Sequence, residues 1–348
     1  MYKRQGYGPW ATIYGVIAIT NIVIGADGAS LTGSQAAISH TQGQAYALRA
    51  LAHFDLLRMY GQHFITGQGG AGSLGVPYVK TYKNPDNLTP ARDTVGSNVG
   101  DITADITTAI SMMSASLDSS AAYMTVAGAY AIGARALLYA GSVDSGLYST
   151  AGTMAKWVID NSGKTPVSAA GFNASFKTDY ASNAIFELSF TGTDNRGING
   201  VAYILRGTSY GDVRILTGDA TASSNLDLLD IADAADVRFA ANMIGTAQGY
   251  PTVLGKYPTM NGSDNITLFR IEEMHLIYAE AMLRGGDAAT AKTYLNNIPA
   301  IRGLGADYYA SATLDNILLE RRKEFYFEGM RYDDLLRMGK GMHFIDAL

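Results

Sequence analysis

The chain has 348 residues, of which 16% are charged and 47% are hydrophobic, and its formal net charge is -5. This balance is typical of a globular protein with a large core and argues against an intrinsically disordered one. The acidic charge also argues against a nucleic-acid partner, because such a protein needs a basic excess to neutralise phosphates. With no cysteine in the sequence, neither a disulfide nor a thiolate metal site can form.

The N-terminal part of the sequence predicts two pairs of amphipathic helices. Residues 10–24 and about 42–60 form the first pair, and the second helix has apolar residues at helical spacing. Residues 97–113 carry an apolar stripe from Val99 to Met113. Residues 123–140 carry a matching stripe, in which Ala and Gly allow two helices to approach closely. We therefore expect helix pairs over about residues 9–60 and 97–142.

The middle of the chain has a different composition. Residues 164–269 contain clusters of Gly, Ser, Asn and Asp between short alternating runs, such as residues 184–190 and 201–205. This composition predicts loops and small strands. Because loops on a rigid scaffold often carry binding sites, we expect the functional residues here and in residues 61–90.

Helical periodicity returns in the C-terminal part. Apolar residues between Met274 and Met282 line one helix, Gly285 and Gly286 stop it, and Asp287 can cap the next. A last helix is expected over about residues 314–338, which completes a third set over residues 272–338. The repeated pairs predict a mostly α fold of tetratricopeptide-like helix pairs. We expect a right-handed superhelical scaffold with a loop-rich irregular region and minor short strands.

Four stretches, in the right order over almost the whole chain, resemble motifs of the SusD/RagB family of outer-membrane nutrient-binding lipoproteins. The first resembles the family's early helix and covers residues 47–61 (ALRALAHFDLLRMYG). The second is similar to its GVP loop and helix entry and covers residues 74–78 (LGVPY) and 90–95 (PARDTV). The third and fourth are similar to its two C-terminal helix motifs and cover residues 270–281 (RIEEMHLIYAEA) and 320–337 (ERRKEFYFEGMRYDDLLR). The chain is identified as a member of this family.

The resemblance implies a single domain over residues 1–348 that binds a glycan at the bacterial cell surface without cleaving it. It also implies a partner, a SusC-type TonB-dependent transporter of the outer membrane, to which the glycan is delivered. No cofactor is expected. Family members begin with a secretion signal and a lipidated cysteine and usually end in a short Pro-rich tail. Since this chain has neither, we expect the natural protein to extend further at both ends and to reach the outer membrane through that lipid anchor.

The candidate ligand contacts rest on side-chain chemistry, because the family's motifs do not carry its binding residues. The sequence contains 22 tyrosines, and an aromatic ring offers a flat apolar face together with a hydrogen-bonding edge, as a sugar ring does. We expect aromatic side chains in or beside the irregular regions to stack on sugar rings while Asn, Asp and Arg bind the hydroxyls. The candidates are Tyr7, Trp10, Tyr203, Tyr210 and Tyr250. Trp157 is left out, because its helical spacing with Met154 indicates packing.

Two other functions stay open at this point. A glycan hydrolase would need paired carboxylates, for which the loop residues Asp194, Asp212 and Asp219 are candidates. A helical-repeat scaffold that binds only protein would carry its aromatic residues on a concave helix surface. A metal site is not expected, because the five histidines are scattered without ligand-like spacing.

Charged side chains inside the predicted helices are interpreted as structural. In residues 320–337 they lie three or four positions apart, as Glu328 and Arg331 do, which is the spacing of neighbours on one helix face. Asp55 lies towards an apolar stripe and needs a donor, for which Arg49 and Arg92 are candidates.

Overall fold

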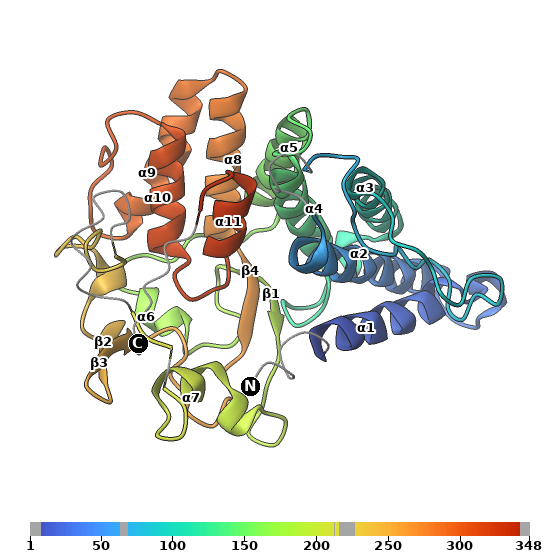
Figure 1. Ribbon diagram of the computed structural model, residues 1–348, viewed down its shortest axis with the longest axis horizontal. Helices are drawn as coiled ribbons and strands as arrows, with labels where there is room; N and C mark the ends of the chain where they lie inside the picture. Colours follow the sequence, from blue (N-terminus) through green and yellow to red (C-terminus); the bar gives the residue numbers. More distant parts are fainter. Residues whose placement is uncertain (1–7, 63–68, 212, 216–226, 342–348) are drawn as a thin grey trace. The chain divides into compact units, whose positions relative to one another are not determined.

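The computed structural model describes residues 8–62, 69–211, 213–215 and 227–341. Helices dominate this part of the chain, and the strands are short (Figure 1). Two compact units can be distinguished, the first running to Asn161 and taking in Leu335–Lys340, the second running from Ser162 to Asp334. The predicted fold class, helix pairs with a loop-rich region and minor strands, is confirmed. The expectation of a single domain over residues 1–348 stays a prediction.

The first unit is a continuous array of helices: α1 (Gly8–Ile24), α2 (Gln35–Tyr60), α3 (Val95–Met112), α4 (Val126–Ala140) and α5 (Leu147–Asn161). Each helix packs on the next in sequence, and α2 also contacts α4. Side-chain hydroxyls fix three of the starts, because Ser34, Thr94 and Thr125 each accept a hydrogen bond from a backbone N–H in the first turn.

Glycines set the spacing between these helices. A Cβ atom added at Gly43 on α2 would lie 2.6 Å from Cγ of Met113, and one added at Gly133 on α4 would lie 2.4 Å from Sδ of Met154. Neither position has room for a side chain, which confirms the close helix contact predicted for residues 123–140. The predicted packing role of Trp157 is also confirmed, because its ring stacks on Tyr130 with centroids 3.9 Å apart.

The second unit combines helices with two small antiparallel sheets. Its elements are α6 (Phe172–Ser175), β1 (Ala184–Leu188), α7 (Val201–Arg206), β2 (Ile244–Ala247), β3 (Tyr250–Val253), β4 (Ile266–Arg270), α8 (Ile271–Arg284), α9 (Ala288–Ile301), α10 (Leu314–Glu324) and the start of α11 (Arg331–Arg337). Strand β1 pairs with β4, and β2 pairs with β3 as a hairpin. Strand β4 runs directly into α8, which packs with α9 and α10 (Figure 1).

Two predicted elements differ from the structure. Residues 201–205, expected as a strand, belong to α7, where Ala202 and Leu205 are buried three positions apart as on one helix face. The last helix is not continuous, because α10 ends at Glu324 and α11 begins at Arg331. Between them Phe327 and Gly329 have positive φ values of 59° and 79°, which a right-handed helix cannot contain.

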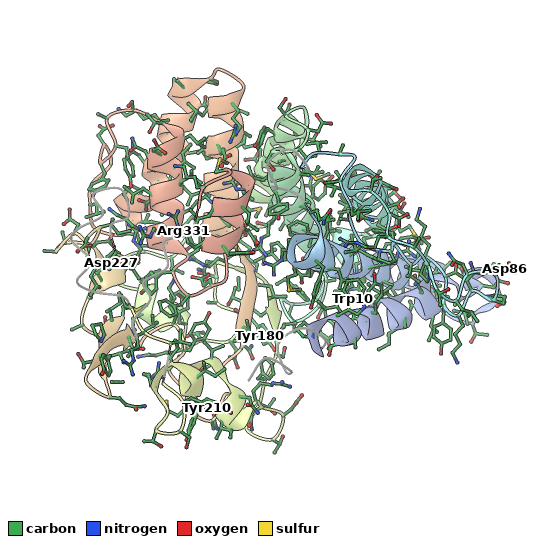
Figure 2. All side chains as sticks on the ribbon, viewed as in Figure 1. Trp10, Asp86, Tyr180, Tyr210, Asp227 and Arg331 are labelled. Carbon is green, nitrogen blue, oxygen red and sulfur yellow. The ribbon has the colours of Figure 1, made fainter. Side chains whose placement is uncertain are left out.

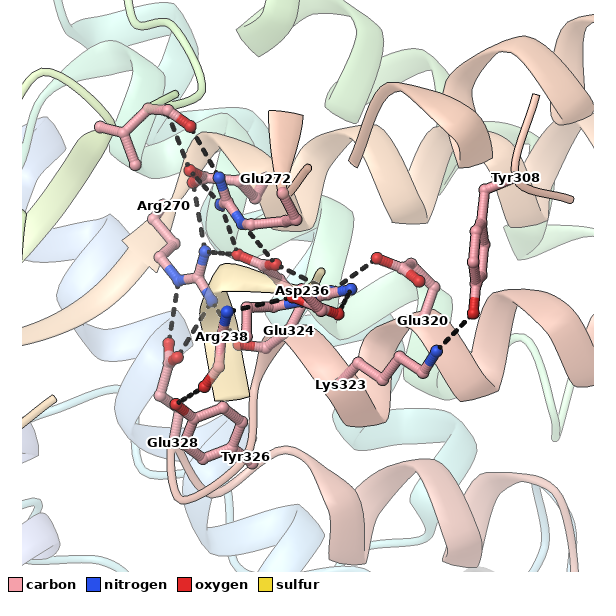
Figure 3. Close-up of polar contacts among 12 residues, drawn as sticks. Asp236, Arg238, Arg270, Glu272, Tyr308, Glu320, Lys323, Glu324, Tyr326 and Glu328 are labelled. Atoms are coloured by element: carbon pink, nitrogen blue, oxygen red, sulfur yellow. Dashed lines mark hydrogen bonds and ion pairs between the residues drawn. The ribbon is translucent and has the colours of Figure 1, made fainter. Parts of the chain in front are cut away.

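Side chains of α8, α10 and neighbouring segments form a network of buried charges (Figure 3). Glu324 lies at its centre and forms ion pairs with Arg238, Arg270 and Arg302. Burial alone would raise the pKa of Glu324, but the three guanidinium groups outweigh it and hold that pKa well below its ordinary value. The remaining carboxylates of the network are Asp236, Glu272, Glu320 and Glu328. The charged motif at residues 320–337 therefore has the predicted scaffold role.

Glu328 of that motif does not pair with Arg331, the partner that its spacing predicted. Glu328 precedes α11 and pairs with Lys256 and Arg270, and Arg321 pairs with Asp334 at 2.8 Å. The break between α10 and α11 explains the difference, because it separates residues that a single helix would have placed side by side.

Candidate functional site

The first unit contains a cleft of about 840 Å³. It lies between the start of α1, the loop from Pro77 to Pro90 and the first turns of α3. The lining residues, which define the cleft below, are Trp10, Tyr14, Pro77, Tyr78, Val79, Lys80, Thr81, Lys83, Asn84, Asn87, Leu88, Pro90, Asp93, Ser97 and Asp101. Its volume falls in the range of small-molecule binding sites, and its lining mixes aromatic with polar side chains.

Three half-buried aromatic rings form one part of the cleft. Trp10 lies near the start of α1 (Figure 2). Its ring centroid lies 4.9 Å from that of Tyr14, and it meets the ring of Tyr60 edge to face at 5.0 Å. Tyr78 stacks on the buried ring of His53, with centroids 3.7 Å apart and an angle of 15° between the planes. Packing against Tyr60 and His53 thus fixes the orientation of these rings.

The wall from Val76 to Lys80 is held mainly by side chains. The carbonyl of Pro77 accepts a hydrogen bond from the Tyr14 hydroxyl at 2.7 Å, and the carbonyl of Val79 accepts one from Asn21 at 2.9 Å. The N–H of Tyr78 donates to the carboxylate of Asp93 at 2.8 Å. Asn98 binds both the N–H and the carbonyl of Val76. Helices α1, α2 and α3 therefore share the positioning of one loop segment.

His53 holds the middle of this wall from α2. Its Nε2 atom accepts a hydrogen bond from the N–H of Val79 at 3.0 Å and therefore carries no proton. The proton of the neutral ring is then on Nδ1, which donates to the carbonyl of Arg49 at 3.0 Å. Burial lowers the pKa of His53 to about 3, so the ring stays neutral near neutral pH.

Arg49 and Asp105 complete the support of the wall. The guanidinium of Arg49 forms two hydrogen bonds of 2.7 Å with the carboxylate of Asp105 and also donates to the carbonyl of Lys80 at 3.1 Å. The hydroxyl of Tyr78 donates to the same carboxylate at 2.6 Å. The proposed pairing of Arg49 with Asp55 was wrong, because Asp55 pairs with Arg58 one turn along α2. Arg92, the other candidate, donates to the carbonyls of Tyr60, Leu74 and Gly75.

Charges in the cleft are largely matched. Lys80 pairs with Asp101 at 2.6 Å, and Asp93 already accepts the N–H of Tyr78. Lys83, on the same loop, has a positive φ of 47°, which is uncommon for a residue other than glycine. The two cleft carboxylates, Asp93 and Asp101, thus have structural partners.

The predicted contact residues fall into two places. Trp10 lines the cleft in the first unit. Tyr203, Tyr210 and Tyr250 lie in the second unit, where Tyr203 meets Tyr210 edge to face at 6.0 Å and the guanidinium of Arg214 lies 3.3 Å over the ring of Tyr250. A hydrogen bond from Gln248 in the β2–β3 turn to the carbonyl of Arg206 ties these segments together. We call Tyr203, Tyr210, Arg214 and Tyr250 the tyrosine patch. Tyr7 lies outside the described residues.

Two cleft aromatics were missed from the sequence. Tyr14 follows Trp10 by four positions on the same helix, so helical spacing could have placed it beside Trp10. Tyr78 ends the LGVPY motif within the loop where functional residues were expected, but no local signal showed that His53 would stack beneath it.

The carboxylates proposed for hydrolysis gain no support as a pair. Asp194 is exposed in a turn, where its N–H donates to the hydroxyl of Thr191. Asp212 and Asp219 lie outside the described residues. Within the part of the chain that the structure describes, no three metal-ligating side chains gather into a possible metal site. None of the described helices is long and apolar enough to span a membrane.

Comparisons with known proteins agree with this architecture. Residues 232–344 match the SusD family, and residues 2–138 match a family described as starch-binding and associating with the outer membrane. A SusD superfamily protein from Bacteroides thetaiotaomicron is 28% identical, with a TM-score of 0.78 and coverage of 95% of this chain and 75% of that one. A protein from Bacteroides vulgatus is 27% identical, with the same TM-score and coverage of 95% of this chain and 73% of that one.

A further solved structure was determined with a xylogluco-oligosaccharide. It is 20% identical to this chain, has a TM-score of 0.72 and is matched over 95% of this chain and 71% of that one. The search of curated proteins finds no match. The two family matches lie in chain order at either end of the sequence, and the structural likeness covers nearly all of it. The chain belongs to the SusD/RagB family.

Proposed function

We propose that this protein captures a glycan in the cleft of the first unit, does not cleave it, and passes it to a SusC-type TonB-dependent transporter at the cell surface. The observation that carries the proposal is the cleft itself, in which Trp10, Tyr14 and Tyr78 meet a wall that three helices hold in place. A site that needs little reorganisation loses little free energy to ordering when a ligand binds.

The chemistry of the cleft suits sugar rings. An aromatic face packs on the apolar face of a pyranose, while Asn84, Asn87 and Ser97 offer hydrogen bonds to hydroxyls. Each such hydrogen bond replaces one made to water, so it adds only about 0.5–1.5 kcal/mol. We therefore expect modest affinity that builds up over several sugar units. The structural neighbour solved with a xylogluco-oligosaccharide supports a glycan as the ligand class.

Two lines of support favour binding without catalysis. Both carboxylates that line the cleft are engaged, Asp101 with Lys80 and Asp93 with the N–H of Tyr78. A glycosidase needs one carboxyl group free to give a proton and a second to act as nucleophile or base. The family description, which names starch binding, points the same way.

A glycan array followed by calorimetry tests the proposal. We expect micromolar to millimolar binding of at least one oligosaccharide, with no new reducing ends after prolonged incubation. Reducing ends that grow in proportion to protein concentration would favour the hydrolase. Binding to no glycan on the array would favour the protein-binding scaffold.

The delivery step needs its own measurement. We expect a SusC-type transporter, co-expressed with the lipid-anchored protein, to co-purify with it from solubilised outer membranes. If the protein purifies without such a partner, the delivery step is wrong even when glycan binding holds.

A further inference from the structure

The second unit contains a pocket of about 340 Å³ that the cleft does not explain. It lies beside the paired ends of β1 and β4, and the turn after α6 and the segment after β3 form its other sides. Its lining includes Phe176, Thr178, Glu187, Tyr257, Asp264 and Thr267. All of its walls belong to one unit.

The walls of this pocket are fixed by hydrogen bonds among its own residues. The buried carboxylate of Glu187 accepts from the N–H of Tyr180 at 2.8 Å and from the hydroxyl of Thr267 at 2.9 Å. Asp264 accepts from the N–H of Thr259 at 2.9 Å, and the hydroxyl of Tyr257 donates to the carbonyl of Phe327 at 2.8 Å. The pocket therefore exists before any ligand arrives.

Its lining offers the contacts that a sugar ring uses. The rings of Phe176 and Tyr257 supply apolar surface, and hydroxyl, amide and carboxylate groups converge on the same space. The volume is large enough for a single pyranose but small for a longer chain.

The charge of the lining selects among sugars. Its carboxylates are Asp179, Glu187, Asp264 and Glu328, and its cations are Lys177 and Lys256. Glu328 is already matched by Lys256 and by Arg270. The remaining charge is negative, so the pocket disfavours uronates and sulfated sugars.

Backbone strain is found beside this pocket. Tyr180 and Phe327 have positive φ values of 55° and 59°, and each directly adjoins a lining residue, Asp179 and Glu328 respectively. Bulky residues in this conformation are costly and persist where the surrounding structure requires a particular local shape.

We propose that this pocket is a second sugar site, which takes one neutral pyranose unit independently of the cleft. The choice of a sugar rests on the proposed function, whereas the exclusion of anionic ligands rests on the pocket alone. A glycan branch or end group bound here would add to the affinity of the chain held in the cleft.

Backbone amide NMR with methyl α-D-glucopyranoside, methyl β-D-xylopyranoside and D-glucuronate tests the proposal. We expect at least one neutral glycoside to shift the amides of residues 176–179, 257, 259 and 263–267, also in the cleft variant Trp10→Ala. Glucuronate should bind at least about tenfold more weakly than the neutral glycosides. Absence of these shifts with both neutral glycosides, or equal binding of glucuronate, would overturn the proposal.

Two exposed threonines give a matched pair of variants. Thr178 lines the pocket and Thr293 lies on α9, and each hydroxyl donates to the carbonyl four residues earlier, at 3.0 and 3.1 Å. Thr178→Trp should fill the pocket and abolish the shifts, while Thr293→Trp should leave them unchanged. Thr267→Val, which removes a wall hydroxyl, should weaken binding about threefold. Unchanged binding in both pocket variants would contradict the proposal.

The same spectra separate this proposal from the proposed function. An oligosaccharide that shifts the amides of residues 76 and 78–80 while the methyl glycosides leave the pocket unshifted would refute the second site alone. An oligosaccharide that shifts the pocket amides but leaves the amides of the cleft wall unperturbed would refute the cleft as the glycan site and keep the second site.

Discussion

The cleft wall of the first unit and the charge network of the second unit are built from the same kinds of side chain but do different things. In the network, the carboxylate of Glu324 meets Arg238, Arg270 and Arg302, and all four side chains are buried. In the wall, Arg49 pairs with Asp105 and uses a further donor on the carbonyl of Lys80, a loop residue of the cleft.

The difference lies in where the remaining hydrogen bonds go. The network is closed mainly among charges and joins α8, α10 and the loop around Arg238, and among its carboxylates Glu328 also lines the pocket of the second unit. The wall directs side-chain hydrogen bonds at the backbone of Val76 to Lys80, so it fixes the shape of a surface that faces the cleft. A buried polar cluster therefore fixes the shape of a cavity when its partners belong to a loop that lines that cavity.

Breaking the network should cost the most stability. Glu324→Gln removes the charge shared by three buried guanidinium groups, and we expect a loss of about 3–5 kcal/mol in the free energy of unfolding. Urea unfolding measures it. The control Asp160→Asn removes the partner of Lys156 in a solvent-exposed pair and should change stability by less than about 0.5 kcal/mol. Equal effects of the two variants would show that the network does not stabilise the fold.

Removing the central support of the wall should affect both stability and binding. His53→Leu leaves the N–H of Val79 without its acceptor and should cost about 1–3 kcal/mol of stability. We also expect a loss of about tenfold in glycan affinity and faster amide exchange at Val79. His53→Gln can both donate and accept, so it should restore most of the affinity. If His53→Leu binds as well as the parent, the wall does not need this support.

The pH dependence of stability should report the buried histidines. Burial lowers the pKa of His53 to about 3 and that of His275 to about 4. The unfolded chain binds these protons near pH 6.5, so below that value it binds more protons than the folded chain and stability falls as the pH is lowered. We expect each histidine to lower the free energy of unfolding by on the order of 1 kcal/mol for each pH unit below about 6.5. His53→Gln should show a shallower slope than the parent between about pH 6.5 and 5, and identical slopes would contradict the assignment.

The smallest effects concern single aromatic contacts. Trp10→Ala should weaken binding of the cognate glycan about fivefold without unfolding the protein, because it removes one ring of the cleft. Tyr210→Ala, in the tyrosine patch, should weaken it about twofold. The exposed Tyr123 lies outside the cleft lining, and Tyr123→Ala serves as the control in calorimetry. If both Trp10→Ala and Tyr210→Ala bind as tightly as the parent, the predicted contacts are misplaced.

The sequence predicted the structure correctly wherever the interactions that determine it are local. Apolar stripes, hydroxyl caps such as Thr94 and the small residues of α4 predicted the helices and their pairing, because these features act within a few turns of one helix. Four ordered motifs indicated the family. Side-chain chemistry singled out Trp10, which lines the cleft and stays a predicted ligand contact. The alternating pattern of residues 201–205 predicted a strand, but these residues belong to a helix that buries Ala202 and Leu205 on one face.

Tertiary structure decided the partners of the charged residues and the construction of the cleft. Glu328 reaches Lys256 and Arg270 because left-handed backbone at Phe327 and Gly329 ends a helix that the sequence pattern would continue. Tyr78 becomes part of the cleft because His53, 25 positions earlier, stacks beneath it and holds the N–H of Val79. Such contacts join residues that are far apart in the sequence, and their geometry depends on how the helices pack, which no local pattern encodes.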